Sequence, residues 1–127
     1  YGGKSMPNIQ VVLFREEDAS VPVVDWMDRL PERAVAKCQV RIQRLRELGH
    51  ELRRPEADYL RDGIYELRIS LRGVQYRLLY FFHGRTAAVL SHGLVKQQVV
   101  PDGEIDRAIE HSVTFKKDPK RYTAEES

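Results

Sequence analysis

Two arginines on neighbouring segments of the chain could share one phosphate group. Arg68 lies in the segment IYELRISL and Arg77 lies in VQYRLLYFF, and a short turn at Arg72 and Gly73 separates them. If the segments form a hairpin that is symmetric about this turn, Arg68 faces Arg77 across the strand pair. Like charges in that position are destabilising. Because guanidinium groups carry a permanent charge and bind phosphate oxygens in pairs, the arrangement predicts a phosphodiester site.

A titratable imidazole and a further cation follow in the next predicted strand. The segment LSHGLVK places His92 and Lys96 beside the arginine face if this strand is adjacent. A histidine can transfer protons near neutral pH, and Lys96 can contact a phosphate. Two simpler alternatives remain open: the arginines could be solvated charges paired with an acid such as Glu66, and His92 could be a structural imidazole beside a glycine.

Further basic residues define a wider predicted RNA-binding surface. Arg61 and Arg72 lie near the ends of the hairpin, and another group repeats at three- and four-residue steps along a predicted helix. Repeated like charge slightly destabilises a helix, which favours an RNA backbone or an acidic protein segment as its partner. A solvated helix face is the alternative for each residue. The helical group consists of Arg33, Lys37, Arg41 and Arg44.

These side chains require a sheet, and the hydrophobic pattern of residues 64–92 predicts one. Apolar residues alternate with polar ones over 64–71, 74–82 and 86–92, which indicates a three-stranded meander. Tyr65 and Tyr80 belong to the apolar face, which we expect to be the core. The arginine face is then the second face, and an antiparallel sheet can leave that face solvated. A three-residue loop with a bulge would shift the register.

The remaining elements predict an α+β fold. Residues 9–14 are typical of a buried strand. A first helix is interrupted at Pro31, where a second helix begins that ends at Gly49. Residues 49–63 are expected to form a loop. Pro101 opens a C-terminal helix. The expected order is β-α-α-β-β-β-α, an antiparallel twisted sheet with a helical hairpin on one face. The charged tail 118–127 is expected to be frayed or dependent on a partner.

Composition limits the protein to one small domain. The 127 residues are 42% hydrophobic, and the formal net charge of +2 is too mild to establish a polyanionic partner. We expect a single domain over 6–117, preceded by a non-native remnant at 1–5. Cys38 is the only cysteine, which excludes an internal disulfide framework and a thiolate zinc site. No metal or cofactor is expected. No apolar segment is long enough to span a membrane, so the cytoplasm is the expected location.

The order of several short motifs resembles one protein family. LRDGIYELRISLRGVQYRLLYFF followed by LSHGLVKQQVVPDGEIDRAIE is similar to the phage-derived HigB branch of the RelE toxin superfamily, from residue 9 to about residue 115. The resemblance implies a RelE-like, microbial-RNase-like fold and a metal-independent mRNA interferase. Such an endoribonuclease acts on messenger RNA in the ribosomal decoding site, where the 2′-hydroxyl attacks the adjacent phosphate. The implied partner is a helix-turn-helix antitoxin.

The resemblance also implies roles for individual residues. Arg68 and Arg77 would bind the scissile phosphate, His92 would transfer a proton and Lys96 would contact phosphate. Glu66 stands where many members have lysine, so it is either a general base or the counter-ion of Arg68. Gln97 is a further departure, at the place of a second lysine. Tyrosines that the superfamily uses from its C-terminal helix have no secure counterpart here, because Tyr122 lies too far into the tail.

Two other functions remain open at this point. The ParE branch of the same superfamily shares the fold and poisons DNA gyrase by binding, without a nuclease site. A second alternative is an inactive relic that only binds the antitoxin, and Gln97 keeps this alternative open.

Overall fold

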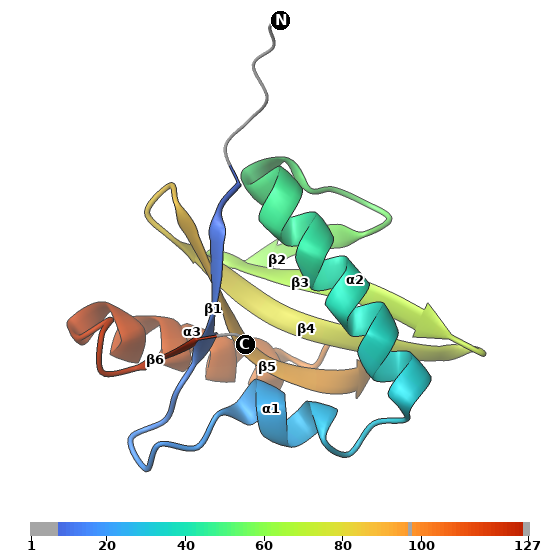
Figure 1. The fold of residues 1–127 in the computed structure, drawn as a ribbon, viewed down its shortest axis with the longest axis horizontal. Coiled ribbons are helices and arrows are strands. Elements are labelled where there is room, and N and C mark those ends of the chain that lie inside the picture. The colour runs from blue at the N-terminus through green and yellow to red at the C-terminus, as the bar shows by residue number, and fades with distance from the viewer. Residues whose placement is uncertain (1–7, 97, 126–127) are drawn as a thin grey trace, which may run out of the picture.

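A six-stranded sheet carries helices on both of its faces (Figure 1). The structure is a computed structural model that describes residues 8–96 and 98–125. The strand order is β2-β3-β4-β5-β1-β6, and β1 runs parallel to β5 while the other neighbouring strands are antiparallel. The elements are β1 Gln10–Phe14, α1 Pro22–Met27, α2 Glu32–Leu48, the 3-10 helix η1 Gly49–Glu51, β2 Ala57–Arg61, β3 Ile64–Leu71, β4 Val74–His83, β5 Ala87–Lys96, α3 Asp102–Lys117 and β6 Thr123–Glu125.

The α+β class is confirmed, and the arrangement is compatible with a RelE-like fold. The expected element order is incomplete, because β2 lies inside the predicted loop 49–63 and β6 lies inside the tail. The sequence ADYLR of β2 mixes polar and apolar residues on an edge strand, so it has little periodic signal. The third predicted strand also continues beyond residue 92 to Lys96. The expectations for residues 1–5 and for Gln97 lie outside the described residues.

The tail is ordered up to Glu125, contrary to the expectation that it is frayed. Residues Thr123–Glu125 pair antiparallel with β1. Just before this strand, the Tyr122 hydroxyl donates a hydrogen bond to Glu17 at 2.6 Å, and Arg121 forms an ion pair with the same carboxylate. The tail therefore covers the edge of β1 that would otherwise have unpaired backbone groups.

The predicted register of the β3–β4 hairpin is confirmed. Arg68 pairs with Arg77, and Glu66 pairs with Leu79. The strands are joined by a two-residue turn in which Arg72 has φ of 52° and Gly73 has φ of 82°. Positive φ at both positions is what a type I′ hairpin turn requires. Arg72 therefore adopts a backbone conformation that is uncommon for a residue with a side chain.

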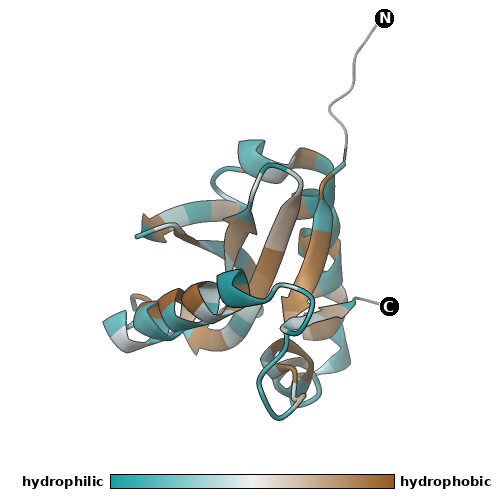
Figure 2. Ribbon diagram, turned by 90° about the vertical axis from the view of Figure 1, so that its left-hand side faces the viewer, coloured by the Kyte–Doolittle hydropathy of each residue, from teal (hydrophilic) through white to brown (hydrophobic). Residues whose placement is uncertain are grey.

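Helices lie on both faces of the sheet, and α3 covers part of the second face, which was expected from the sequence to be solvated. On one face, α2 packs Ala34, Cys38, Ile42 and Leu45 against the sheet residues, among them Leu67 and Leu78. On the other face, α3 places Ile105, Ala108 and Phe115 over a second apolar cluster that includes Ile64, Leu79, Phe81 and Val89. Figure 2 shows apolar residues gathered on the central strands between these helices. Within the described residues, no helix is long and apolar enough to cross a membrane.

Helix α1 is held by a close contact between Trp26 and Gly93 of β5. The indole lies so near the glycine that a Cβ atom there would overlap the ring. Trp26 is buried and also meets the ring of Tyr76 edge-on, with centroids 6.2 Å apart. The absence of a side chain at Gly93 is therefore what lets α1 reach the sheet.

We predict that Gly93→Ala lowers the free energy of unfolding by about 1–3 kcal/mol, because the new methyl group forces Trp26 out of its place. Gly103→Ala is the matched control, since a Cβ at Gly103 meets nothing within 4 Å at the start of α3. The control should leave stability unchanged or raise it by up to about 1 kcal/mol. Urea unfolding of both variants measures the difference, and equal stability of the two would contradict the role of Gly93.

Candidate phosphate-binding site

A single buried carboxylate stands between the two opposed arginines. Arg68 Nη1 donates to Glu66 Oε2 at 2.8 Å, and Arg77 Nε lies 3.2 Å from Glu66 Oε1. The second contact is an ion pair without hydrogen-bond geometry, because neither Arg77 Nε nor Glu66 Oε1 has a hydrogen-bond partner. Only 3% of Glu66 and 1% of Arg77 are exposed. Glu66 thus offsets the repulsion that the strand register imposes on the arginines.

Lys96 brings a third cation to the same place. It pairs with Gln75 across β4 and β5, beside the row that holds Arg77. Burial lowers the pKa of Lys96, and the charges of Arg77 and Arg68 lower it further. Burial is also the main cause that lowers the pKa of Arg77, although Glu66 opposes that shift. We call Glu66, Arg68, Arg77 and Lys96 the phosphate cluster: two of its cations form ion pairs with Glu66, and Lys96 lies beside them on the same sheet face.

The members of the phosphate cluster differ in their access to solvent. The side chain of Arg68 is 25% exposed, and Lys96 is half-buried. Arg77 is covered and donates from Nη1 to the carbonyl oxygen of Tyr76 at 2.9 Å. The expectation that Arg77 faces solvent is therefore wrong. Arg68 and Lys96 are therefore the cations of the cluster that are open to solvent, and Arg77 is buried beside Glu66.

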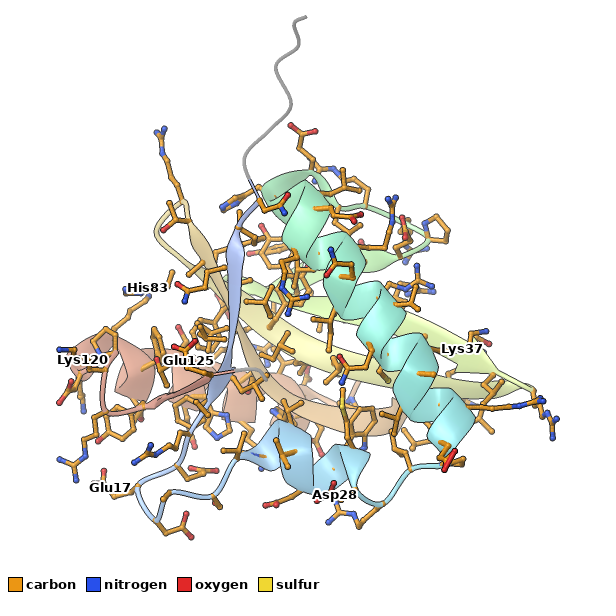
Figure 3. The ribbon with its side chains drawn as sticks, viewed as in Figure 1. Glu17, Asp28, Lys37, His83, Lys120 and Glu125 are labelled. Carbon is orange, nitrogen blue, oxygen red and sulfur yellow. The ribbon has the colours of Figure 1, made fainter. Side chains whose placement is uncertain are left out.

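Two residues of the predicted helix stripe lie next to the phosphate cluster. Lys37 and Arg41 of α2 line a groove of about 320 Å³ together with Arg68, Ser70 and Gln75. Lys37 projects from α2 on the side of β3 and β4 (Figure 3). The groove exists because β2 begins opposite Leu67, so α2 reaches the part of β3 that follows. The two basic surfaces predicted separately are thus continuous.

The other predicted RNA-binding residues lie elsewhere. Arg44 and Arg41 both bond to Glu56, at 2.8 Å and 2.7 Å. Arg61 forms an ion pair at 2.8 Å with Asp106 of α3. The last two, Arg33 and Arg72, line a separate and mainly apolar cavity of about 340 Å³ at the hairpin turn. The structure does not bring Arg33, Arg44, Arg61 or Arg72 into the phosphate cluster.

His92 belongs to a buried chain of hydrogen bonds between β5 and α3. Its Nε2 lies 2.9 Å from Glu104 Oε1, and its Nδ1 lies 2.8 Å from the hydroxyl of Ser91. The same hydroxyl lies 2.8 Å from Nδ1 of His111, whose Nε2 is 3.3 Å from Glu16. Only 1% of His92 is exposed. Its position in the sheet is separated from Glu66 by Leu79, which pairs with both residues.

Both imidazoles in this chain are held neutral. Burial lowers the pKa of His92 to about 3, and Arg107 and His111 act in the same direction. Burial and Arg107 lower the pKa of His111 to about 4. Two neutral imidazoles and one hydroxyl supply three hydrogens for four contacts. One of the four contacts therefore lacks a hydrogen, and the Ser91 hydroxyl links the two rings.

Most residues of this buried hydrogen-bond network were not expected from the sequence. Ser91, Glu104 and His111 were not candidate residues, although the spacing of Glu104 and His111 places them on one face of the C-terminal helix. That spacing was the available signal. The partner of a buried histidine on another element is not visible in one sequence, because it depends on how α3 docks on the sheet.

We predict that Ser91→Ala lowers the free energy of unfolding by about 1–3 kcal/mol, because two buried imidazole nitrogens lose their shared partner. Ser112→Ala is the matched control, since Ser112 lies on α3 and is only half-buried. The control should change stability by less than about 0.5 kcal/mol. Urea unfolding of the two variants measures this, and an equal loss in both would show that the hydroxyl of Ser91 is dispensable.

We also predict that acid destabilises the protein below pH 6.5. The unfolded imidazoles bind protons near their ordinary pKa of 6.5, whereas His92 and His111 stay neutral down to about 3 and about 4 in the folded chain. The unfolded state then binds more protons, so stability falls by on the order of 1 kcal/mol per pH unit for each histidine. Urea unfolding at pH 7.5 and 5.5 should show the loss.

Two variants isolate the histidine contribution to this acid effect. His111→Gln should have a smaller loss between the two pH values, because one of the two neutral imidazoles is gone. His50→Gln should keep the full loss, because His50 is exposed in η1. If His111→Gln and the unsubstituted protein lose equal stability, the buried imidazoles are not the cause.

Comparison with known proteins supports a family assignment. A family model for phage-derived Gp49-like proteins (DUF891) matches residues 25–112, a range that contains the whole phosphate cluster. A search of curated proteins finds no match.

Proposed function

We propose that this chain, which belongs to the Gp49-like family of phage-derived proteins, is a toxin that cleaves messenger RNA on the ribosome. The family belongs to the RelE/HigB-like toxin superfamily and is associated with toxin–antitoxin systems. The observation that carries the nuclease proposal is the phosphate cluster. Arg68 and Arg77 share one buried carboxylate there and Lys96 adds a third cation, and this surplus of positive charge suits a phosphodiester.

In the proposed reaction, the 2′-hydroxyl of a nucleotide attacks the adjacent phosphorus atom. The bond to the 5′ oxygen breaks, which leaves a cyclic phosphate and a free 5′-hydroxyl. Negative charge grows on the phosphoryl oxygens, so fixed cations stabilise the transition state. Arg68 and Lys96 are the accessible cations and bind the phosphate directly. Arg77, buried behind them, holds Glu66 in place through their ion pair.

Two proton transfers must accompany this reaction, and the cluster contains a group for each. Glu66 accepts the proton of the 2′-hydroxyl once the phosphate attracts Arg68 away from its carboxylate. Lys96 gives a proton to the leaving oxygen, and its lowered pKa makes that transfer easier. His92 is a positioning residue in this scheme, because its ring bonds to Ser91 and Glu104 and joins β5 to α3.

The groove beside the cluster indicates how a longer strand is held. Lys37 and Arg41 lie along the same groove as Arg68, so they can bind the phosphates that flank the cleaved one. A toxin family also implies an antitoxin partner, and we propose a helix-turn-helix protein in that role. An acidic segment of such a partner would neutralise the same groove and block RNA.

We predict that brief expression in bacteria produces new RNA 5′ ends within translated messages. Arg68→Ala should reduce these cuts by about 10²-fold to 10³-fold, because it removes the exposed cation that stabilises the transition state. Lys96→Ala should also reduce them. Mapping of RNA 5′ ends after a short induction measures the effect.

The matched control is Arg85→Ala, an exposed arginine on the turn at the opposite end of β4. This variant should cut as the unsubstituted protein does. Growth arrest without cuts would replace the nuclease by a binding toxin of the gyrase-poisoning type. Absence of both arrest and cuts, with folded protein, would leave an inactive antitoxin-binding relic.

A further inference from the structure

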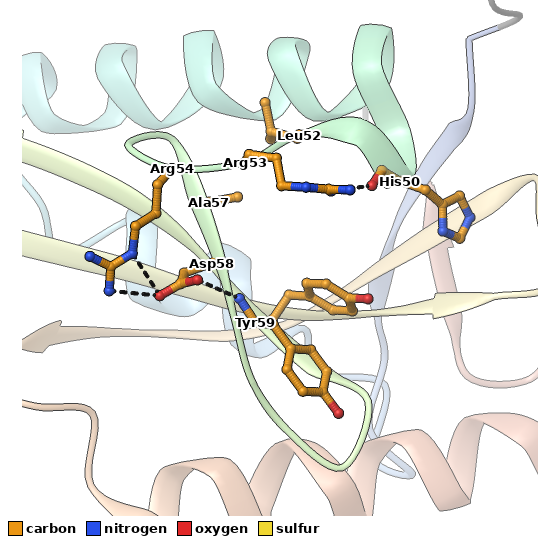
Figure 4. A pocket seen from close by; sticks show the side chains of 8 residues that line it. His50, Leu52, Arg53, Arg54, Ala57, Asp58 and Tyr59 are labelled. Atoms are coloured by element: carbon orange, nitrogen blue, oxygen red, sulfur yellow. Dashed lines mark hydrogen bonds and ion pairs between the residues drawn. The ribbon is translucent and has the colours of Figure 1, made fainter.

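A second pocket lies at the β2 edge of the sheet, outside the phosphate cluster (Figure 4). Its volume is about 460 Å³, which is within the range of pockets that bind small ligands. It is lined by aromatic rings and by charged side chains from η1, the following loop, β2 and β3. The lining residues are His50, Leu52, Arg53, Arg54, Ala57, Asp58, Tyr59 and Tyr65.

The aromatic side of the pocket is unusually accessible. Tyr59 is 52% exposed, although it lies in a strand. Its ring meets Tyr65 edge-on, with centroids 5.0 Å apart, and Tyr65 stacks in turn on buried Tyr80. The hydroxyl of Tyr59 accepts a hydrogen bond from the backbone N–H of Gly63 at 3.0 Å. The ring is therefore held in place by the β2–β3 turn while much of its surface stays open.

The charged side of the pocket favours an anion. Arg54 is paired with Asp58 through two contacts, at 2.9 Å and 2.8 Å. Arg53 is exposed and donates one hydrogen bond to the carbonyl oxygen of His50 at 2.7 Å. Within the part of the chain that the structure describes, no carboxylate forms an ion pair with Arg53. The pocket thus carries one cation in excess of its acids.

The pocket adjoins the phosphate cluster across the β2–β3 strand pair. Asp58 of the pocket pairs with Glu66 of the cluster, and Asp58 also holds Arg54 through two contacts. The hydrogen bond from Arg54 is the main cause that lowers the pKa of Asp58, and the charge of Arg68 lowers it further. The Arg54–Asp58 pair therefore lies between the pocket and the cluster.

We propose that this pocket binds one nucleotide of the RNA, a few positions from the cleaved phosphate, with the base on Tyr59 and a phosphate on Arg53. Aromatic rings bind bases by stacking, and a guanidinium binds phosphate. The inference rests on the proposed ribonuclease function for its biological meaning. The binding itself is independent of cleavage, so it can be measured on the isolated protein.

The test uses nucleoside 5′-monophosphates and the corresponding nucleosides as probes. Each is titrated into the full chain while the tyrosine ring resonances are followed by NMR. We expect saturable binding that Tyr59→Leu weakens about tenfold or more and that Tyr59→Phe preserves, because phenylalanine keeps the stacking surface. Arg53→Gln should weaken the monophosphates and leave the nucleosides unaffected. Arg85→Gln controls for the loss of one positive charge.

Several results would overturn the nucleotide pocket. Equal binding by Tyr59→Leu and Tyr59→Phe would show that the ring does not stack on a base. Full displacement by inorganic phosphate alone, with no nucleoside binding, would reduce the pocket to an anion site. In cells, cuts that keep their positions and frequency in Tyr59→Leu would separate the pocket from cleavage. Absence of cuts in the unsubstituted protein would instead remove the proposed function, and the titration would still decide the pocket.

Discussion

The arrangement of the whole sheet face depends on one shared carboxylate. Glu66 lies between Arg68 and Arg77, and its burial with Arg77 takes both charges out of water. Removal of one partner from such a pair leaves an uncompensated charge, which is more costly than the pair itself is stabilising. The hairpin register is thereby fixed by electrostatics as well as by the apolar pattern. Arg68 shares its acid, Glu66, with Arg77. Among the described contacts, no carboxylate forms an ion pair with Lys96.

The second face of the sheet has two halves with different chemistry. One half is apolar and covered by α3, which packs Ile105, Ala108 and Phe115 over the strands. The other half carries the phosphate cluster, whose Arg68 also lines the groove that Lys37 and Arg41 of α2 border. The buried chain from Glu104 through His92, Ser91 and His111 to Glu16 marks the boundary. Polar contacts at that boundary hold α3 in one position, because unsatisfied buried imidazoles would oppose any other.

Sequence patterns predicted the parts of this structure that depend on local chemistry. The hairpin register followed from period-two alternation and one turn, and Arg68 opposite Arg77 was correct for that reason. Strand β2 and the cover over Arg77 were not predicted, because edge pairing and helix docking depend on contacts between distant segments. His92 was identified as a candidate residue from the sequence, but its hydrogen-bond partners Ser91 and Glu104 were not. The pocket around Tyr59 was missed for the same reason, since all of its lining residues except Tyr65 were assigned to a loop.

The parallel pairing of β1 with β5 has a consequence for how the chain folds. Strands β2 to β5 follow one another along the chain and pair with their sequence neighbours, so their contacts close only short loops. Strand β1 must instead find β5 across most of the chain, and loop closure of that length is entropically more costly. We infer that the meander, and with it the Glu66 ion pairs, forms before β1 docks. The chemistry of the cluster is then assembled early, and the two ends of the chain close the sheet last.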